Sequence, residues 1–392
     1  MGRLIKHLTD LTVNRPDPIV DNIPVLEYSQ NIDPQYAVEA LLEGNYVLVA
    51  DRFSSGIAIL DALKKHLSKQ FKNESFQAQR SYRNTLRKVS QLLLIEISGH
   101  KLHVRKAPEI GWIKILYPEL PDFFLPFTDA QGLNSSWQWY EKGIRIPGLK
   151  QTLHPFYGTY FPTRFEHIEL FVRYLKAYNG KKDRAFDIGI GSGILSKLFH
   201  QFDFKEVNAS DINPNALIGS LYSNPLNINN EQTKSRKTEN HKSSANISAP
   251  LREVKQPIEK RTNLYFGDLF AGSGIKSDVV VFNPPWIPLP KEVSGIDLAI
   301  YYDDELFPRF FEEASKHLNP CGHLVILFSN LAGLMDPHFI HPVEAELEHW
   351  QRFTLVQKTT KKVAAASSKT KRKALWRDHE LVECWVLKSS MS

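Results

Sequence analysis

The stretch Ala185-Phe-Asp-Ile-Gly-Ile-Gly-Ser-Gly-Ile194 decides how the rest of this chain is interpreted. An apolar run leads into Asp187, glycines follow at every second position, and the next residues have the apolar spacing of a helix. Glycine permits backbone conformations and close approaches that a Cβ atom would block. A helix start leaves N–H groups free to meet a ligand. The stretch therefore predicts a strand, a ligand-binding turn at Gly189, Gly191 and Gly193, and a helix.

The chain continues with alternating strand and helix patterns, which indicate an α/β domain built on a parallel sheet. A helix over 163–178 precedes the glycine stretch. The expected strands lie at 185–189, 206–211, 263–267, 278–283, 323–328, 353–358 and 380–387. The other expected helices lie at 193–202, 214–223, 305–318 and 343–350.

Three further motifs follow expected strands. They are Ser210-Asp211-Ile212-Asn213-Pro214, Phe266-Gly267-Asp268-Leu269-Phe270 and Val279-Val-Val-Phe-Asn-Pro-Pro-Trp-Ile-Pro288. In this order, after Asp187-x-Gly-x-Gly-x-Gly, the set resembles the class I S-adenosylmethionine-dependent methyltransferases. The likeness runs from about Pro162 to the carboxyl terminus and is greatest to enzymes that modify planar nitrogens, the HemK-type glutamine methyltransferases and the amino-group methyltransferases of nucleic acids. It implies a Rossmann-like fold with a seven-stranded, mostly parallel sheet whose last strand is antiparallel.

The resemblance and the chemistry of S-adenosyl-L-methionine together assign binding roles. The glycine turn would meet the methionine end, while Asp187 would hold the turn or accept from the ammonium group. A carboxylate accepts two hydrogen bonds side by side, so Asp211 suits the ribose diol. Asp268 is the expected acceptor for the adenine amino group. The adenine ring would be flanked by Ile212 and Leu269.

The run Asn283-Pro284-Pro285-Trp286 carries the expected catalytic chemistry. The nitrogen of an amide or a nucleobase amino group is a poor nucleophile because its lone pair is delocalised. Two fixed acceptors, the Asn283 side-chain oxygen and the Pro284 carbonyl, would orient the NH₂ group and stabilise its developing charge. The prolines restrict the backbone, and Trp286 would stack on the planar group. Most of the catalysis is then positioning, with no metal ion required.

The amino-terminal part has no recognised relative. Residues 1–148 mix helix and strand patterns and are expected to form a smaller α+β domain that recognises the substrate. A Pro- and Gly-containing linker, 149–163, joins it to a methyltransferase domain over 164–392. Helices are expected from Asp33 and over 56–67, a hairpin over 92–106 with Lys101, His103 and Arg105 on one face, and a strand holding Trp137 and Trp139. Residues 226–262 have no hydrophobic period and predict a mobile insertion.

Composition restricts the class of protein. The chain has 392 residues, 42% of them hydrophobic and 23% charged, which is ordinary for a globular protein of two domains. No apolar run is long enough to span a membrane, and the amino terminus does not resemble a signal peptide. Cys321 and Cys384 are expected to be small buried residues of apolar strands, so we expect a reducing, cytoplasmic location.

The expected partner is a macromolecular substrate, and the oligomeric state stays open. A protein glutamine is favoured by the combination of Gly267-Asp-Leu-Phe270 with Ile287 and Pro288. The alternative is an adenine or guanine amino group in RNA or DNA. The nucleic-acid alternative is favoured by residues 358–377, which carry eight basic side chains and no acidic one. The net charge of +6 also permits it. A solvated charge run is the other interpretation of these residues.

Two other classes of protein share parts of this pattern. An NAD(P)-dependent oxidoreductase would also use an acidic residue at Asp211, but its loop has the spacing Gly-x-Gly-x-x-Gly, and it has no role for Asn283-Pro-Pro-Trp286. A non-catalytic protein that keeps the methyltransferase fold for binding is the remaining possibility.

Overall fold

The computed structural model describes residues 3–5, 10–71, 76–221, 262–289, 301–364 and 379–390. The chain divides into two compact units. One is Arg15–Glu141, and the other holds the described residues before and after it. The predicted insertion at 226–262, except Thr262, and most of the basic run, 365–377, lie outside the described residues.

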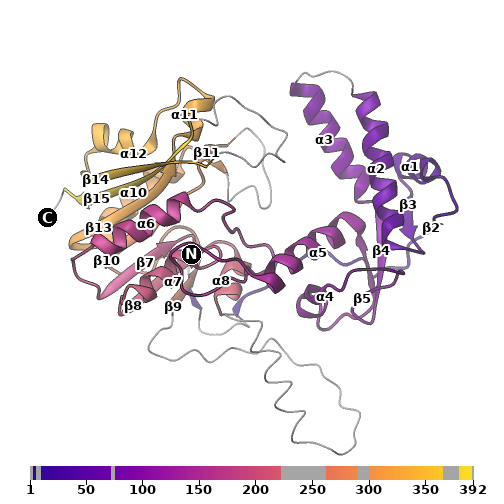
Figure 1. Cartoon of the computed structure of the whole chain (residues 1–392), viewed down its shortest axis with the longest axis horizontal. Helices are drawn as coiled ribbons and strands as arrows, with labels where there is room; N and C mark the ends of the chain where they lie inside the picture. The colour runs from indigo at the N-terminus through magenta and orange to yellow at the C-terminus, as the bar shows by residue number, and fades with distance from the viewer. Residues whose placement is uncertain are drawn as a thin grey trace, which may run out of the picture. The chain divides into compact units, whose positions relative to one another are not determined.

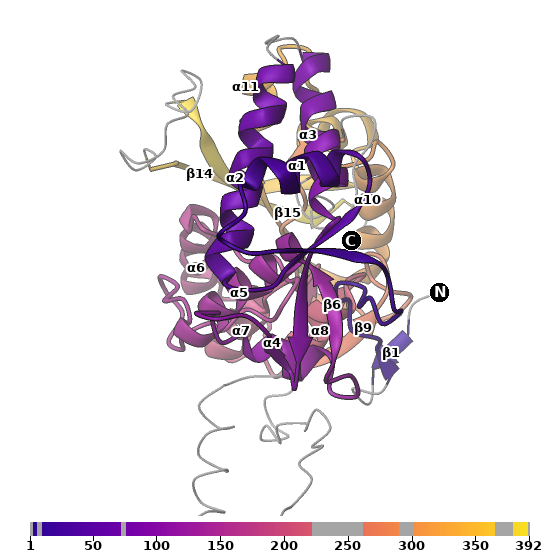
Figure 2. The ribbon, with the colours of Figure 1, turned by 90° about the vertical axis from the view of Figure 1, so that its right-hand side faces the viewer.

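The larger unit is built on one eight-stranded sheet, in the order β1-β9-β8-β7-β10-β13-β15-β14. The strands in that order are Arg3–Ile5, Thr262–Phe266, Glu206–Asp211, Arg184–Ile188, Ser277–Phe282, Leu318–Ser329, Leu381–Ser389 and Phe353–Lys362. From β9 to β13 all neighbours are parallel, whereas β15 runs antiparallel to both β13 and β14. The predicted Rossmann-like, mostly parallel sheet is thus confirmed, and β1 adds an antiparallel edge strand beside β9 (Figure 2).

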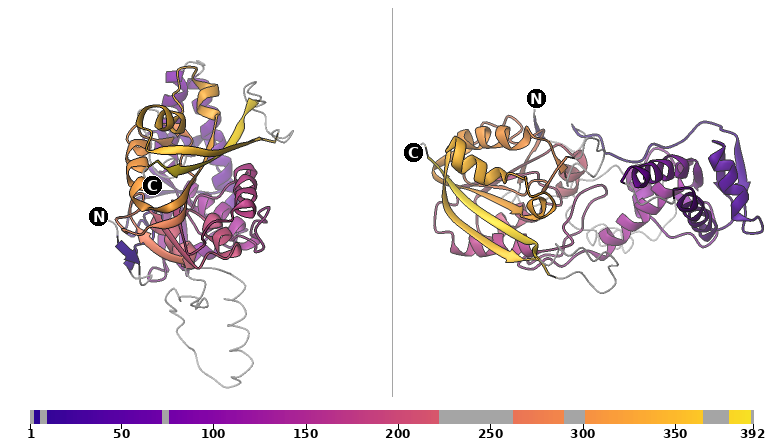
Figure 3. Two further views of the ribbon diagram at one scale, coloured as in Figure 1. Left: turned by 90° about the vertical axis from the view of Figure 1, so that its left-hand side faces the viewer. Right: turned by 90° about the horizontal axis from the view of Figure 1, so that it is seen from above.

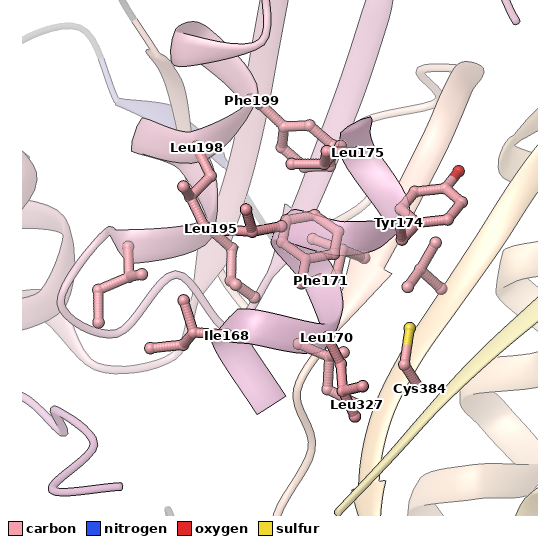
Figure 4. Close-up of a cluster of buried hydrophobic side chains, with 14 of the residues drawn as sticks. Ile168, Leu170, Phe171, Tyr174, Leu175, Leu195, Leu198, Phe199, Leu327 and Cys384 are labelled. Atoms are coloured by element: carbon pink, nitrogen blue, oxygen red, sulfur yellow. The ribbon is translucent and has the colours of Figure 1, made fainter. Parts of the chain in front are cut away.

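Strand β10 shows why the central strands are mainly apolar. Val279 and Val281 join a core cluster with helices α6 (Glu166–Ala177) and α7 (Ile194–Gln201). Val280 and Phe282 join a second cluster with α10 (Leu306–His317) on the other face. Successive strand residues point to opposite faces, so strands of a sheet covered on both faces have nearly continuous apolar runs. Figure 4 shows the first cluster, where Phe171 of α6 lies against Leu195 of α7.

Shorter helices complete the larger unit. Pro214–Leu221 forms α8 after β8, Leu331–Met335 forms α11 after β13, and Pro342–Ala345 forms α12, which continues as a π-helical turn over Glu346–Trp350 (Figure 1). The β14–β15 hairpin is long and curved (Figure 3, left). A two-residue parallel pair, β11 (Ile287–Pro288) with β12 (Tyr301–Tyr302), follows the Asn-Pro-Pro-Trp run.

The smaller unit has a five-stranded sheet with helices packed on it. Its strands are β2 (Val25–Tyr28), β3 (Tyr46–Val49), β4 (Leu93–Ser98), β5 (Lys101–Leu102) and β6 (Phe123–Pro126). Its helices are α1 (Pro34–Leu42), α2 (Phe53–Gln70), α3 (Phe76–Ser90), α4 (Gly111–Leu116) and α5 (Phe127–Lys142). Asp33 caps α1 as predicted, accepting from Gln35 N–H at 2.9 Å.

Three local predictions were wrong. Trp137 lies in helix α5, where it packs edge-on to Trp112, and Trp139 lies in the same helix; two tryptophans alone are too short a pattern to distinguish a strand from a helix. The strand expected to carry His103 and Arg105 ends at Leu102. Cys321 is exposed rather than buried, because β13 bends out of register near it and gives it a φ of 63°.

Within the described residues, no helix has the length and apolar character that a bilayer crossing demands.

Candidate active site

The glycine turn, the two acidic motifs and the Asn-Pro-Pro-Trp run all lie at one edge of the sheet. Ile188 pairs in register with Phe282 and with Ser210, so Gly189, Asn283 and Asp211 each follow directly at the ends of adjacent parallel strands. The Gly267 N–H donates to the Asp211 carbonyl at 3.0 Å, which brings the third motif beside the second. Ligands of open α/β sheets bind outside this carboxyl edge.

The glycine turn has a backbone that side chains would obstruct. Gly189, Gly191 and Gly193 have φ values of 66°, 50° and 78°, in the left-handed region where a Cβ atom is strained. At Gly191 a Cβ atom would lie 3.4 Å from the Tyr160 carbonyl oxygen. The turn therefore lies close to the backbone of Tyr160 and leads into α7.

Asp187 is fully buried beneath this turn. Its Oδ2 accepts from the Ser196 N–H at 2.9 Å and from the Ser196 hydroxyl at 2.7 Å, which fixes the first turn of α7. Its Oδ1 has no hydrogen-bond partner among the described residues. Burial raises the pKa of Asp187 to about 7, and the nearby Asp211 adds to the effect. Of its two expected roles, holding the turn is the one that its hydrogen bonds to Ser196 support.

We expect Asp187 to make stability fall with rising pH. The pKa is higher in the folded chain, about 7, than in an unfolded chain, about 3.9. Between these values the folded state binds the extra proton, so the free energy of unfolding decreases as pH rises. Asp187→Asn, which keeps an oxygen for Ser196, should remove this part of the pH dependence. Melting temperatures of both proteins from pH 4 to 8 measure it, and parallel curves would contradict it.

Asp211 ends strand β8 and is partly buried. Its Oδ2 accepts from the Gly191 N–H at 2.9 Å and its Oδ1 from the Asn213 N–H at 2.8 Å. Burial raises its pKa to about 6 even though these N–H groups favour the ionised form. Each oxygen keeps a lone pair for a further donor, which fits a ribose diol. The neighbouring Ile212 is 55% exposed, so it offers an apolar surface beside those oxygens.

Asp268 is placed differently from Asp211. Its side chain is about half exposed, and its Oδ2 accepts from Arg309 at 2.6 Å while its Oδ1 accepts from the Leu269 N–H at 3.0 Å. Leu269 itself is 4% exposed and packs in the core cluster of α10, with a positive φ of 45°. Contact of Asp268 and Leu269 with an adenine ring stays a prediction, and such a contact would compete with Arg309.

The Asn-Pro-Pro-Trp run leaves a buried acceptor unused. Asn283 Oδ1 is buried and has no hydrogen-bond partner among the described residues, although buried acceptors are nearly always paired. Pro284 is buried and Pro285 half-buried. Trp286 is anchored by its indole N–H, which donates to the Leu327 carbonyl at 3.2 Å. An unpaired amide oxygen three residues before a fixed aromatic ring suits a planar NH₂ ligand.

Sequence reasoning missed two polar residues at the start of α6. His167 is 4% exposed, stands edge-on to Trp286 with ring centroids 5.6 Å apart, and has an unpaired Nδ1 among the described residues. Burial lowers its pKa to about 4, so it is neutral near pH 7. Glu166 is also buried, accepts from the Ala364 N–H and keeps Oε2 unpaired. Two polar residues in the first turn of a helix with many apolar residues were the signal that could have found them.

No metal centre is formed by the described residues, where no group of three or more His, Cys, Asp or Glu side chains converges.

No protein-family model matches the chain. A protein of Methanocaldococcus jannaschii with the provisional name protein N5-glutamine methyltransferase is 28% identical over 198 residues, covering 48% of this chain and 81% of its own length. Among solved structures, the ribosomal protein L11 methylase of Lactobacillus delbrueckii is 16% identical, with a TM-score of 0.32 over 57% of this chain and 78% of its own. The tRNA m1G37 methyltransferase of M. jannaschii is 14% identical, with a TM-score of 0.31 over 60% of this chain and 52% of its own. These scores are too low to argue from, and the fold rests on the strand order.

Proposed function

We propose that this chain, an S-adenosylmethionine-dependent methyltransferase, methylates the side-chain amide nitrogen of a glutamine in a protein substrate. The observation that carries the proposal is the unpaired, buried Oδ1 of Asn283, next in sequence to the prolines that lead to Trp286. The similarity to a protein named as an N5-glutamine methyltransferase supports the choice of substrate.

The residues at the sheet edge fit such a cofactor. Asp211 has a free lone pair on each carboxylate oxygen for the ribose hydroxyls, and the turn at Gly191 leaves room for close approach. S-adenosylmethionine would supply a methyl group activated by a positive sulfur. The chain's own task is to present the acceptor nitrogen in line with that methyl group and to exclude water.

Asn283 and Trp286 would present the acceptor. The Asn283 oxygen and the Pro284 carbonyl accept from the two N–H bonds of the amide, which draws its lone pair out of conjugation and stabilises the positive charge that develops on nitrogen. Trp286 covers one face of the planar group. The nitrogen becomes acidic once it carries the methyl group, so its proton leaves to water without a dedicated strong base.

The contacts of the basic run support a protein over a nucleic acid. Lys358 pairs with Glu383 at 3.1 Å and lies 3.9 Å from the centre of the Trp385 ring. Lys361 pairs with Glu169. A lysine that already has a carboxylate partner gains less from a phosphate group. The described part of the 358–377 run is therefore a weaker phosphate site than its composition indicates.

Transfer of a labelled methyl group tests the substrate. The purified protein and tritiated S-adenosylmethionine are added to an extract of cells that lack the protein. We expect label in a protein band that resists ribonuclease and yields N5-methylglutamine on proteolytic digestion. Label that ribonuclease releases, together with steeply salt-dependent binding of purified rRNA, would establish the nucleobase alternative. Absence of transfer, with binding of the cofactor intact, would favour the non-catalytic class.

The size of the Trp286 ring gives a further prediction. Trp286→Ala should raise the KM for the protein acceptor by about tenfold, and Trp286→Phe by much less, because a stacked aromatic contact contributes about 0.5–1.5 kcal/mol. Trp286 also packs against both core clusters, so melting temperatures must accompany the kinetics. Equal KM values for the two variants would argue against stacking.

A further inference from the structure

A short segment of the larger unit passes directly over the glycine turn. Residues Tyr157–Tyr160, here named the strap, lie outside any helix or strand. The Tyr160 carbonyl oxygen is the nearest atom to the position that a Cβ atom on Gly191 would occupy, at 3.4 Å. Tyr160 itself is 42% exposed. The strap therefore borders the proposed cofactor site without belonging to the sheet.

Two asparagines that follow strand β8 fasten the strap. The Asn213 side-chain amide donates to the Gly158 carbonyl at 2.9 Å, and the Asn215 side-chain amide donates to the Tyr157 carbonyl at 2.9 Å. Gly158 has a φ of 69°, and a Cβ atom there would lie 3.0 Å from Asn215 Nδ2. Glycine is thus required for the strap to come this close.

Asn215 is completely buried, and its amide is fully used. Besides Tyr157, its NH₂ group donates to the Asn14 carbonyl at 2.7 Å, and its Oδ1 accepts from the Asn14 N–H at 2.7 Å. One side chain therefore joins the amino-terminal segment, the strap and the start of α8. A buried amide with every group satisfied specifies a single arrangement of the segments around it.

The same asparagines connect the strap to the ribose-binding candidate. Asn215 N–H donates to Asn213 Oδ1 at 3.1 Å, Asn213 N–H donates to Asp211 Oδ1 at 2.8 Å, and Gly191 N–H donates to Asp211 Oδ2 at 2.9 Å. A continuous set of hydrogen bonds thus runs from the strap through Asp211 to the glycine turn. Movement of the strap and the geometry of the cofactor site cannot be independent.

We infer that Asn213 and Asn215 are positioning residues that hold the strap across the bound cofactor and slow its release. The inference rests on the proposed function. Release requires the strap to lift, so weakening its fastening should raise the dissociation rate of the cofactor product and leave the association rate nearly unchanged, the usual pattern when contacts are lost.

The test uses the whole chain and S-adenosylhomocysteine as the probe. Asn213→Ser keeps a side-chain oxygen for Asn215 N–H but removes the amide donor to Gly158. Gly158→Ala adds a Cβ atom 3.0 Å from Asn215 Nδ2, which should push the strap away from that side chain. Asn319→Ala is the matched control, because Asn319 donates to Asp278 at 2.8 Å, at the opposite end of strand β10. We expect dissociation about tenfold faster in each of the first two variants, with unchanged calorimetric stoichiometry. The double variant should show less than the sum of the two effects, because both loosen the same segment.

The possible results distinguish failure of the strap inference from failure of the proposed function. If the wild-type chain binds S-adenosylhomocysteine and both strap variants release it at the wild-type rate, the inference is wrong and the proposed function stands. A lower stoichiometry with an unchanged rate indicates lost folded protein and also overturns the inference. If the wild-type chain does not bind the probe, the proposed function fails, and the inference fails with it.

Discussion

Replacing Asn283 by alanine should lower the rate of methyl transfer about 100- to 1,000-fold, the usual cost of losing an acceptor or donor aimed at developing charge. The affinity for S-adenosylhomocysteine should be unchanged. The reason is the Oδ1, which is paired with no described residue and which we propose accepts from the acceptor NH₂ group. Stability should also hold, since truncating an unpaired acceptor removes a cost rather than a contact.

Single-turnover transfer of a labelled methyl group and calorimetry with S-adenosylhomocysteine measure the two quantities separately. Asn283→Gln is the matched variant, because it keeps the amide but moves its oxygen by one methylene, and it should be almost as slow as Asn283→Ala. A full rate in either variant would remove Asn283 from the mechanism. An equal loss of cofactor affinity would place it in the cofactor site instead.

Replacing Asp211 by alanine should weaken binding of S-adenosylhomocysteine about 100-fold. Two hydrogen bonds from the ribose hydroxyls to a carboxylate are lost, each contributing about 1.5–3 kcal/mol, and Gly191 N–H loses its acceptor. The rate of the chemical step at saturating cofactor should change much less, because Asp211 does not touch the acceptor. Asp211→Asn keeps an acceptor of the same shape and should retain part of the affinity.

The raised pKa of Asp211 adds a pH dependence. Hydroxyl donors favour the ionised carboxylate, and the pKa in the free protein is about 6. As pH falls below that value, binding must first remove a proton, so affinity should fall by about tenfold per pH unit. Above pH 7 it should be level. Titrations of the wild type and Asp211→Asn between pH 5 and 8 test this, and the same slope in both proteins would contradict the assignment.

The larger unit was predictable from sequence because its strands lie between helices on both faces. A strand such as 278–283 has a continuous apolar run, Val279–Phe282, and the polar residue Asn283 that follows interrupts that pattern sharply. The order of the motifs then fixed which ends are neighbours. Sequence patterns failed for Trp137, where two tryptophans two positions apart were too few to establish a strand period, and for Cys321, where an irregular strand turns one residue outward.

The surroundings of the site were not predictable in the same way. His167, Glu166 and the strap depend on contacts between segments distant in sequence, such as Asn14 with Asn215. No local pattern encodes which buried atom is left unpaired, because that depends on what every neighbouring segment contributes. The ion pair of Asp268 with Arg309 is another such contact.

The edge strand β1 has a consequence for how this protein is made. Residues 3–5 pair with 264–266, so β1 is synthesised about 260 residues before its partner strand β9. Without β1, β9 would have no neighbour on that side, and an open strand edge recruits other chains. A gene product shortened to the residues after Glu141 would carry this edge permanently, and we expect it to aggregate during expression while the 392-residue chain stays dispersed.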